Sequence, residues 1–459
     1  MSRPNRVSHK LKDVVRRELA VELDKVHQKA DWGGQLTDEM LAYAANDTKV
    51  LLPLAEALAS RAKEAKLELT AEIERRALPA IAWLANAGLP FDREGWTEHL
   101  KGLEKEKRLL TKELDKLVPE APDGKARNWN SHLQVKEAFG LAGVKLPNIQ
   151  EKTLPRIDHP LAKNLLKYKK VSTMLSNYGP KLLEFVSKED RIYADWHQIG
   201  AETGRMSCSK PALQNLPPEV KGYVRAPEGR VLIKTDYSQI ELRIAAKISG
   251  DEKMLEAYQE GEDIHVLTAK SLASVGVGKE DRKLAKAVNF GLLYGQGAKG
   301  LKDYARDKYE MDITLGEAAL YKRRFFETYP GLAAWHERER LRMKRGETET
   351  RTLAGRRRVG VTRFTEWVNA PVQGTGADGL KLALALLSER REECPGAVPV
   401  ACVHDEIVVE CHEDQDEKVS AWLEKVMIEG MEEVLNGSEV VGPRVPVEVE
   451  THIDKTWAG

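Results

Sequence analysis

The sequence is poor in cysteine, carries no net charge and has no long apolar run. Its four cysteines, Cys208, Cys394, Cys402 and Cys411, show no C-x-x-C spacing in a chain of 459 residues. So small and scattered a set argues against a disulfide scaffold and a zinc site, and we expect four reduced thiols. Lysine plus arginine total 72, as do aspartate plus glutamate, so net charge neither indicates nor excludes a polyanionic partner.

Membrane and export signals are also missing. No stretch resembles a membrane span, and the opening MSRPNRVSHKLKDV lacks the apolar segment of a signal peptide. We therefore expect an intracellular protein, in the cytoplasm or nucleoid, with no membrane partner. The length predicts about three structural units. A hydrophobic fraction of 42% and a charged fraction of 31% are typical of a globular protein with many amphipathic helices.

The most informative stretch is RVLIKTDYSQIELR, residues 230–243. Its apolar run predicts a short buried strand that ends near Asp236. A helix is expected from Ser238 onward, because Ile240, Ile244 and Ile248 recur at helical spacing. Taken alone, an aspartate just before a helix is more often an N-cap than a metal ligand.

A second carboxylate site lies in VPVACVHDEIVVEC, residues 398–411. Two β-branched runs flank His404, Asp405 and Glu406, which predicts a hairpin with the charges at its turn. Adjacent strand residues face opposite ways, so Asp405 and Glu406 are not expected to be equivalent ligands. Asp236 and Asp405 together form a pair suited to two hard cations.

A third stretch, residues 282–294, places Arg282, Lys286, Phe290 and Tyr294 four residues apart. On a helix these side chains share one side. Two cations near a helix N-terminus oppose the macrodipole, which favours a bound anion such as a triphosphate. A sugar and a base would then pack on the aromatic rings. The alternative is a helix with core aromatics and solvated cations.

Two further segments carry weaker signals. Residues 10–66 alternate charged and apolar positions as helices do, and place Tyr43 and Asp47 on one helix face. This pair fits either a metal-dependent exonuclease or a solvated face, and the lack of any Asp-x-Glu in residues 1–42 argues against intact nuclease chemistry. Residues 191–217 form an extended, glycine- and proline-containing stretch, in which Arg205 and Gln214 are candidate donors to phosphates, sugars or base edges. By itself this stretch is typical of a surface loop.

Two segments are expected to be helical. Residues 160–186 are predicted to form one long helix, and residues 251 to about 345 are predicted to be mainly helical.

Together these motifs resemble the family A DNA polymerases of the bacterial polymerase I type. DYSQIELR, RKLAKAVNFGLLYG and VHDEIVVE resemble the family's motifs A, B and C, and HQIGAETGR, LQNLP and NAPVQGTGAD are also similar. The resemblance covers nearly the whole chain. It implies an α+β right-hand fold: a truncated 3'-5' exonuclease-like remnant (1–66), then a polymerase domain (67–459) with thumb (about 90–190), palm (about 191–250 and 350–459) and fingers (about 251–349).

The resemblance also implies the catalytic roles. Asp236 and Asp405 would bind two Mg²⁺ ions, for which Mn²⁺ may substitute, and Tyr237 would add a backbone carbonyl. Lys286 would hold the triphosphate and protonate pyrophosphate, while Glu406 would be an accessory carboxylate. The other implied residues bind nucleotide or DNA: Arg282 at the triphosphate, Phe290 near the sugar, Tyr294 near the template base, Glu241 against a ribose 2'-hydroxyl, and Arg205, Gln214, Asn215, Gln239, Gln373 and His404 at primer, template or nucleotide.

The expected function is template-directed addition of dNTPs to a primer 3'-hydroxyl, with release of pyrophosphate, in DNA replication or repair. We expect a monomer whose partners are primer-template DNA and dNTPs. Tyr43 and Asp47 resemble the third exonuclease motif, but the first two are missing, so proofreading is not expected. Separately, we expect no 5'-nuclease domain. A single-subunit RNA polymerase and a non-catalytic DNA-binding protein are the alternatives. Glu241 and the His-Asp-Glu triplet favour DNA synthesis.

Overall fold

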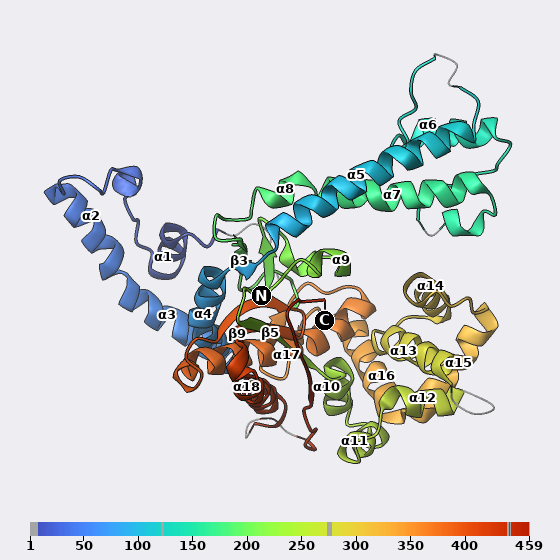
Figure 1. The fold of residues 1–459 in the computed structure, drawn as a ribbon. Coiled ribbons are helices and arrows are strands. Elements are labelled where there is room, and N and C mark those ends of the chain that lie inside the picture. Colours follow the sequence, from blue (N-terminus) through green and yellow to red (C-terminus); the bar gives the residue numbers. More distant parts are fainter. Residues whose placement is uncertain are drawn as a thin grey trace.

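The computed structural model describes residues 8–458 apart from 121–123, 152, 273–277, 438–439 and 441. The chain combines many helices with a four-stranded antiparallel sheet, which confirms the predicted α+β class (Figure 1). In the described part of the chain, no helix has both the length and the apolar character needed to cross a membrane.

The N-terminal residues form a small helical unit, as predicted. It contains α1 (Leu11–Leu19), α2 (Asp38–Lys49) and α3 (Leu51–Glu64). Thr37 caps α2, because its hydroxyl accepts a hydrogen bond from the Met40 amide. In Figure 1 these blue helices extend to one side of the sheet and lead into α4 (Glu68–Ala87).

Two long helices project from the opposite side of the sheet. α5 (Arg93–Lys116) and α7 (Pro160–Tyr178) run along each other, with α6 (His132–Leu141) toward their far end (Figure 1). The sequence predicted one helix over residues 160–186, and this was wrong. The helix ends at Tyr178, because Pro180 disfavours helical geometry in the residue before it, and α8 (Pro180–Leu183) starts afresh.

The central sheet has the strand order β10-β5-β9-β8. Its strands are β5 (Arg230–Tyr237), β8 (Val398–Val403), β9 (Glu406–His412) and β10 (Val449–Asp454). Side chains of β5 alternate between two cores: Val231 and Ile233 belong to one, and Leu232 to the other. Burial on both faces explains why this strand reads as an unbroken apolar run.

Helices α17 (Phe364–Glu389) and α18 (Asp416–Asn436) pack closely on each other beside the sheet. Glycine permits this contact: a Cβ on Gly430 would lie 2.5 Å from the Ala383 amide nitrogen, and one on Gly379 would lie 2.3 Å from the Met431 sulfur. α4 packs against α17 from another side.

The described residues of 240–344 are mainly helical, which confirms the helix predicted after Ser238 and the helical segment predicted from residue 251. The helices are α10 (Ile240–Ser249), α11 (Glu252–Gln259), α12 (Ile264–Leu272), α13 (Lys279–Leu293), α14 (Ala298–Tyr309), α15 (Leu315–Thr328) and α16 (Pro330–Lys344). The remaining short elements are α9 (Pro218–Lys221) and the strand pairs β1 (Leu89–Pro90) with β2 (Arg191–Ile192), β3 (Asp195–His197) with β4 (Ser207–Ser209), and β6 (Thr350–Arg351) with β7 (Arg357–Arg358).

A buried charge network joins α4 to Arg356, to α17 and to the loop around Gly204. Glu74 of α4 accepts hydrogen bonds from Arg356 and from Lys381 Nζ (2.5 Å). Arg356 Nε also donates to Asp378 Oδ1 (2.7 Å), and Lys381 Nζ donates to the Gly204 carbonyl (2.8 Å). Because each buried charge has an opposite partner, the network holds α4, α17 and the 204–205 loop in one arrangement.

Candidate active site

Asp236 lies on the central strand between two other carboxylates. The strand register places it opposite Glu406 of β9 and Glu450 of β10. Its Oδ1 atom is buried and has no hydrogen-bond partner among the described residues. The local sequence alone favoured an N-cap role for Asp236, and the structure corrects this. α10 begins only at Ile240, and Gln239, with φ +52°, occupies the N-cap position.

The predicted hairpin is present and brings Asp405 to the same end of the sheet. β8 and β9 are joined by the two-residue turn His404-Asp405, since Val403 pairs with Glu406. His404 has φ +56°, a left-handed conformation that costs energy in a residue other than glycine. The Tyr237 amide donates to the Asp405 carbonyl (3.4 Å), so the two predicted metal-binding segments are directly adjacent.

The electrostatics of this sheet end favour a bound cation. Burial, together with the charges of Glu406 and Glu450, raises the pKa of Asp236 to about 6. Burial likewise raises the pKa of Asp405 to about 7, with contributions from Asp236 and then Glu241. These carboxylates repel one another, and a hard cation would relieve both the repulsion and the unpaired Oδ1 atom.

The described residues include no group of three or more His, Cys, Asp or Glu side chains placed to hold a metal. Two carboxylates still fit Mg²⁺, because this ion is commonly held by one or two carboxylates together with substrate phosphates and water. Glu450 was missed by sequence reasoning. It lies in an alternating strand with no distinguishing motif, and only the pairing of β10 with β5 brings it to the site.

Glu241, on the first turn of α10, connects two other predicted residues. Its Oε1 accepts a hydrogen bond from Arg205 Nη2 (2.7 Å), and its Oε2 accepts one from the Tyr294 hydroxyl. Burial raises the pKa of Tyr294 well above its ordinary value, with Glu241 adding and Arg205 and Gln373 opposing, so the phenol remains a donor. The structure thus brings together four predicted residues from separate segments.

The cationic helix α13 faces a second small cluster. Arg282 donates to Asp263 Oδ2 through Nε (2.9 Å) and Nη2 (2.6 Å). Burial raises the pKa of Asp263, but the hydrogen bonds from Arg282 and the His265 amide, together with the charge of Arg282, outweigh this, and the pKa is lowered. Phe290 packs against the His265 ring at 5.8 Å, and Gln239 Nε2 reaches Asp263 at 3.4 Å. Sequence reasoning missed Asp263 and His265, which precede the recognised helix and carry no motif of their own.

Lys286 lies in α13 one turn beyond Arg282, while Tyr294 is the residue that ends the helix rather than part of it. The sequence predicted that all four side chains share one side of a helix. In the structure, three of them lie within α13 at that spacing: Arg282, Lys286 and Phe290.

Three other predicted DNA-binding residues have different surroundings. Gln214 Nε2 donates to the carbonyls of Cys402 (3.0 Å) and Met206 (3.4 Å), so its donor group is already used within the protein. Asn215 is exposed, and its carbonyl accepts from the Tyr178 hydroxyl (2.8 Å). The His404 side chain is exposed at the hairpin turn. The DNA-binding roles of Gln214, Asn215 and His404 stay predictions.

Tyr43 and Asp47 lie on α2 as predicted, but a lysine occupies the space between them. Lys25 Nζ donates to both carboxylate oxygens of Asp47 at 2.7 Å and lies 3.4 Å from the Tyr43 hydroxyl. An ammonium group thus neutralises the one carboxylate that the sequence had suggested for exonuclease chemistry. No motif signalled Lys25.

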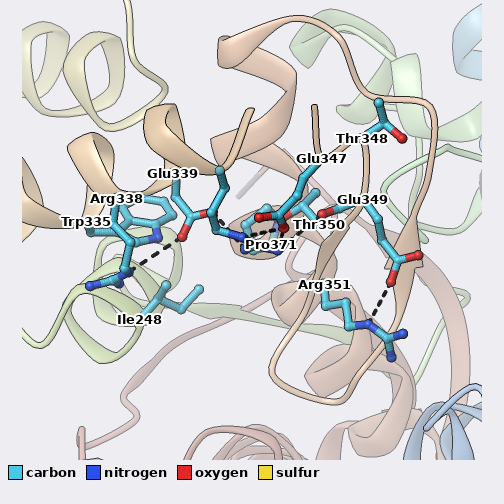
Figure 2. A pocket seen from close by; sticks show the side chains of 11 residues that line it. Ile248, Trp335, Arg338, Glu339, Glu347, Thr348, Glu349, Thr350, Arg351 and Pro371 are labelled. Atoms are coloured by element: carbon cyan, nitrogen blue, oxygen red, sulfur yellow. Dashed lines mark hydrogen bonds and ion pairs between the residues drawn. The ribbon is translucent and has the colours of Figure 1, made fainter. Parts of the chain in front are cut away.

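One pocket lies apart from these residues (Figure 2). It is lined by α16, the end of α10, Pro371 of α17 and residues 347–351, and contains none of the predicted site residues. Its charged side chains are paired with one another: Arg342 with Glu347 and Arg351 with Glu349, each at 2.9 Å. This pairing gives the pocket no evident preference for an anion or a cation.

The mixed fold, the paired carboxylates at one sheet end and the cationic helix α13 are features that suit a polymerase of the nucleotidyltransferase class. Residues 97–459 match the model of DNA polymerase family A, and residues 2–63 match that of a 3'-5' exonuclease. The chain belongs to DNA polymerase family A and is a DNA-directed DNA polymerase, which confirms the prediction from sequence.

Known relatives agree with this assignment. DNA polymerase I of Aquifex aeolicus is 36% identical, over 98% of this chain and 81% of that protein. The thermostable DNA polymerase I of Thermus thermophilus is 33% identical over 93% of this chain, which spans about half (52%) of the relative's length. A solved structure titled as the POL domain of Pol1 from M. smegmatis in complex with DNA primer-template and dNTP has a TM-score of 0.80, at 26% identity, and covers all of this chain and 80% of its own.

The carboxylate repulsion predicts that Asp405→Asn stabilises the metal-free protein. The folded-state pKa of Asp405, about 7, lies above the unfolded value near 3.8. The folded state therefore binds more protons between these values, and its stability falls as pH rises from about 4 to 7. In EDTA the variant should have a higher Tm than the unaltered chain at pH 8 and no advantage at pH 4. An equal or lower Tm at pH 8 would show that burying the charged Asp405 carboxylate beside its acidic neighbours does not destabilise the fold.

Proposed function

We propose that the chain extends a primer 3'-hydroxyl on a DNA template with dNTPs and releases pyrophosphate, with Asp236 and Asp405 as ligands of two Mg²⁺ ions, for which Mn²⁺ can substitute. The observation that carries this proposal is the pair of mutually repelling carboxylates at the sheet end, one with an unpaired buried oxygen. When bound, the ions activate the 3'-hydroxyl and stabilise charge on the departing pyrophosphate. Tyr237 would contribute its carbonyl, and Glu406 would act as an accessory carboxylate.

The incoming nucleotide is proposed to bind along α13. Arg282 and Lys286 would contact the triphosphate, and Lys286 would donate a proton to pyrophosphate. Arg282 is held by Asp263 in this structure, so a triphosphate would have to compete with that carboxylate for the guanidinium. Phe290 would lie near the sugar and Tyr294 near the template base.

Glu241 is proposed to exclude a ribose 2'-hydroxyl. Its carboxylate accepts hydrogen bonds from Arg205 and from Tyr294, so displacing it would break both bonds. The surrounding contacts to primer, template or nucleotide are proposed for Arg205, Gln214, Asn215, Gln239, Gln373 and His404.

The units correspond, in our proposal, to those of a right hand. α5 to α7 form the thumb (about 90–190), α11 to α16 the fingers (about 251–349), and the four-stranded sheet with α17 and α18 the palm. Residues 1–66 form the exonuclease-like remnant. We propose that the polymerase acts as a monomer on primer-template DNA.

Primer extension on a gapped template with Mg²⁺ tests the proposed function. The unaltered chain should extend the primer, and Asp236→Ala should lower the rate by roughly a thousandfold or more, because an essential metal ligand is removed. Duplex binding should be retained. Asp414→Ala, which removes a carboxylate that is 76% exposed, is the matched control and should extend normally. Normal extension by Asp236→Ala would instead favour a non-catalytic DNA-binding protein.

Nucleotide choice tests the role of Glu241. Glu241→Ala should raise the kcat/KM for an rNTP relative to the matching dNTP by at least about tenfold, because the space beside the 2' carbon opens. Glu241→Gln keeps the side-chain volume and should remain selective. Efficient use of rNTPs by the unaltered chain would support the RNA polymerase alternative.

The Lys25 to Asp47 ion pair predicts no removal of mismatched primer 3' ends. With its carboxylate neutralised by lysine, the N-terminal unit has no evident means of binding a metal there. Mismatched, 3'-labelled primer incubated with Mg²⁺ and no dNTP should stay intact. Trimming that disappears in Asp47→Ala would show that this site is active.

A further inference from the structure

The C-terminal residues of the chain pack against the residues that lead into the central strand, and the Trp457 side chain of this segment reaches Glu406. After β10, the amide of Trp457 donates to the Val224 carbonyl (3.0 Å), and the Ala226 amide donates to the Lys455 carbonyl (2.9 Å). Lys455 Nζ donates to the carbonyl of Arg230, the first residue of β5 (3.1 Å). This segment is therefore fixed against the residues that lead into the central strand.

The Trp457 side chain is buried, with 2% of its surface exposed, and its indole donates a hydrogen bond from Nε1 to Glu406 Oε1 (2.8 Å). Lys221 of α9 covers the ring, with Nζ 4.1 Å from the ring centroid. This cation–π interaction stabilises the ring in its position. The indole is thus held by backbone on one side and by a cation over its face.

Glu406 is the residue directly opposite Asp236 in the strand register and follows Asp405 in the chain. A glutamate side chain has three rotatable bonds, so a carboxylate near two others of like charge would turn away unless it were held. The indole N–H of Trp457 donates a hydrogen bond to this carboxylate and restrains it.

We propose that Trp457 is a positioning residue for the polymerase reaction: its indole N–H fixes the Glu406 carboxylate beside Asp236 and Asp405. This inference rests on the proposed function and assigns to the C-terminal segment a part in the active site. A purely structural Trp457 would fill space, and phenylalanine would serve nearly as well.

The test is Trp457→Phe in the full chain, since phenylalanine keeps an aromatic ring and removes the N–H group. Primer extension should show a kcat about tenfold lower, as is typical when a group that orients a metal-site residue is lost. The KM for dNTP, the duplex affinity and the Tm should change little. The Mg²⁺ concentration for half-maximal rate should rise, and Mn²⁺ binding, followed by electron paramagnetic resonance, should weaken.

Two controls separate positioning from packing. Trp422→Phe makes the same change at a buried indole whose Nε1 has no partner in the described structure, and should extend primers normally. In a Glu406→Ala background, Trp457→Phe should have no further effect on kcat or on Mn²⁺ binding, because the group it orients is gone.

The inference is overturned if Trp457→Phe extends primers normally, or if it lowers kcat equally in the Glu406→Ala background. It is also overturned if the loss of kcat is accompanied by a fall in Tm, because the loss would then come from reduced stability. It is also overturned if Mn²⁺ affinity does not change. The unaltered chain is assayed alongside. A lack of extension by that chain contradicts the proposed function itself, whereas normal extension by Trp457→Phe contradicts only the role of Trp457.

Discussion

The register between β5 and β9 is the constraint on which the active site depends. Side chains alternate along β5 between two separate cores, so a shift of one residue would exchange the residues that face each core. The same shift would move Asp236 away from Glu406 and from the hairpin turn that carries Asp405. Apolar burial on both faces therefore fixes the positions of carboxylates that repel one another. The hydrophobic cores compensate for an arrangement that electrostatics alone would disfavour.

The second constraint is the cluster of buried charges formed by Glu74, Arg356, Asp378 and Lys381. Glu74 belongs to α4, which precedes the residues matched by the DNA polymerase family model, yet its carboxylate is bound by two cations of the polymerase body. Lys381 also holds the Gly204 carbonyl, and the next residue, Arg205, donates to Glu241. Removing one member would leave a buried charge without its partner. α4 is therefore part of the structural unit that supports Arg205.

Much of this architecture could be predicted from the sequence because it depends on local patterns. The apolar run of β5, the hairpin around His404-Asp405 and the helix carrying Arg282 are all set by residues close together in the chain. The roles of site residues were misread or missed where distant residues decide the outcome. Asp236 taken alone looked like an N-cap, and only its neighbours on other strands show otherwise.

Contacts between distant segments carry no local signal. Asp263 holds Arg282, Glu450 enters through strand pairing, and Lys25 reaches Asp47 across 22 positions. None of these residues belongs to a pattern that indicates its partner. The helix predicted through residue 186 failed for a local reason, the effect of Pro180 on the preceding residue, which periodicity alone does not take into account.

The two acidic sites of this chain show what distinguishes a functional carboxylate from a neutralised one. Asp47 has a permanent cation: the Lys25 ammonium bonds to both of its oxygens, so a metal ion would have to displace a covalently attached competitor. Asp236 has the opposite surroundings, with a buried oxygen that lacks a partner and two carboxylates across the strands. That state is unfavourable without a ligand, and the same imbalance is available as binding energy when cations and a nucleotide enter. Sequence motifs are present at both sites. The presence or absence of an internal counter-charge therefore separates them more clearly than the motifs do.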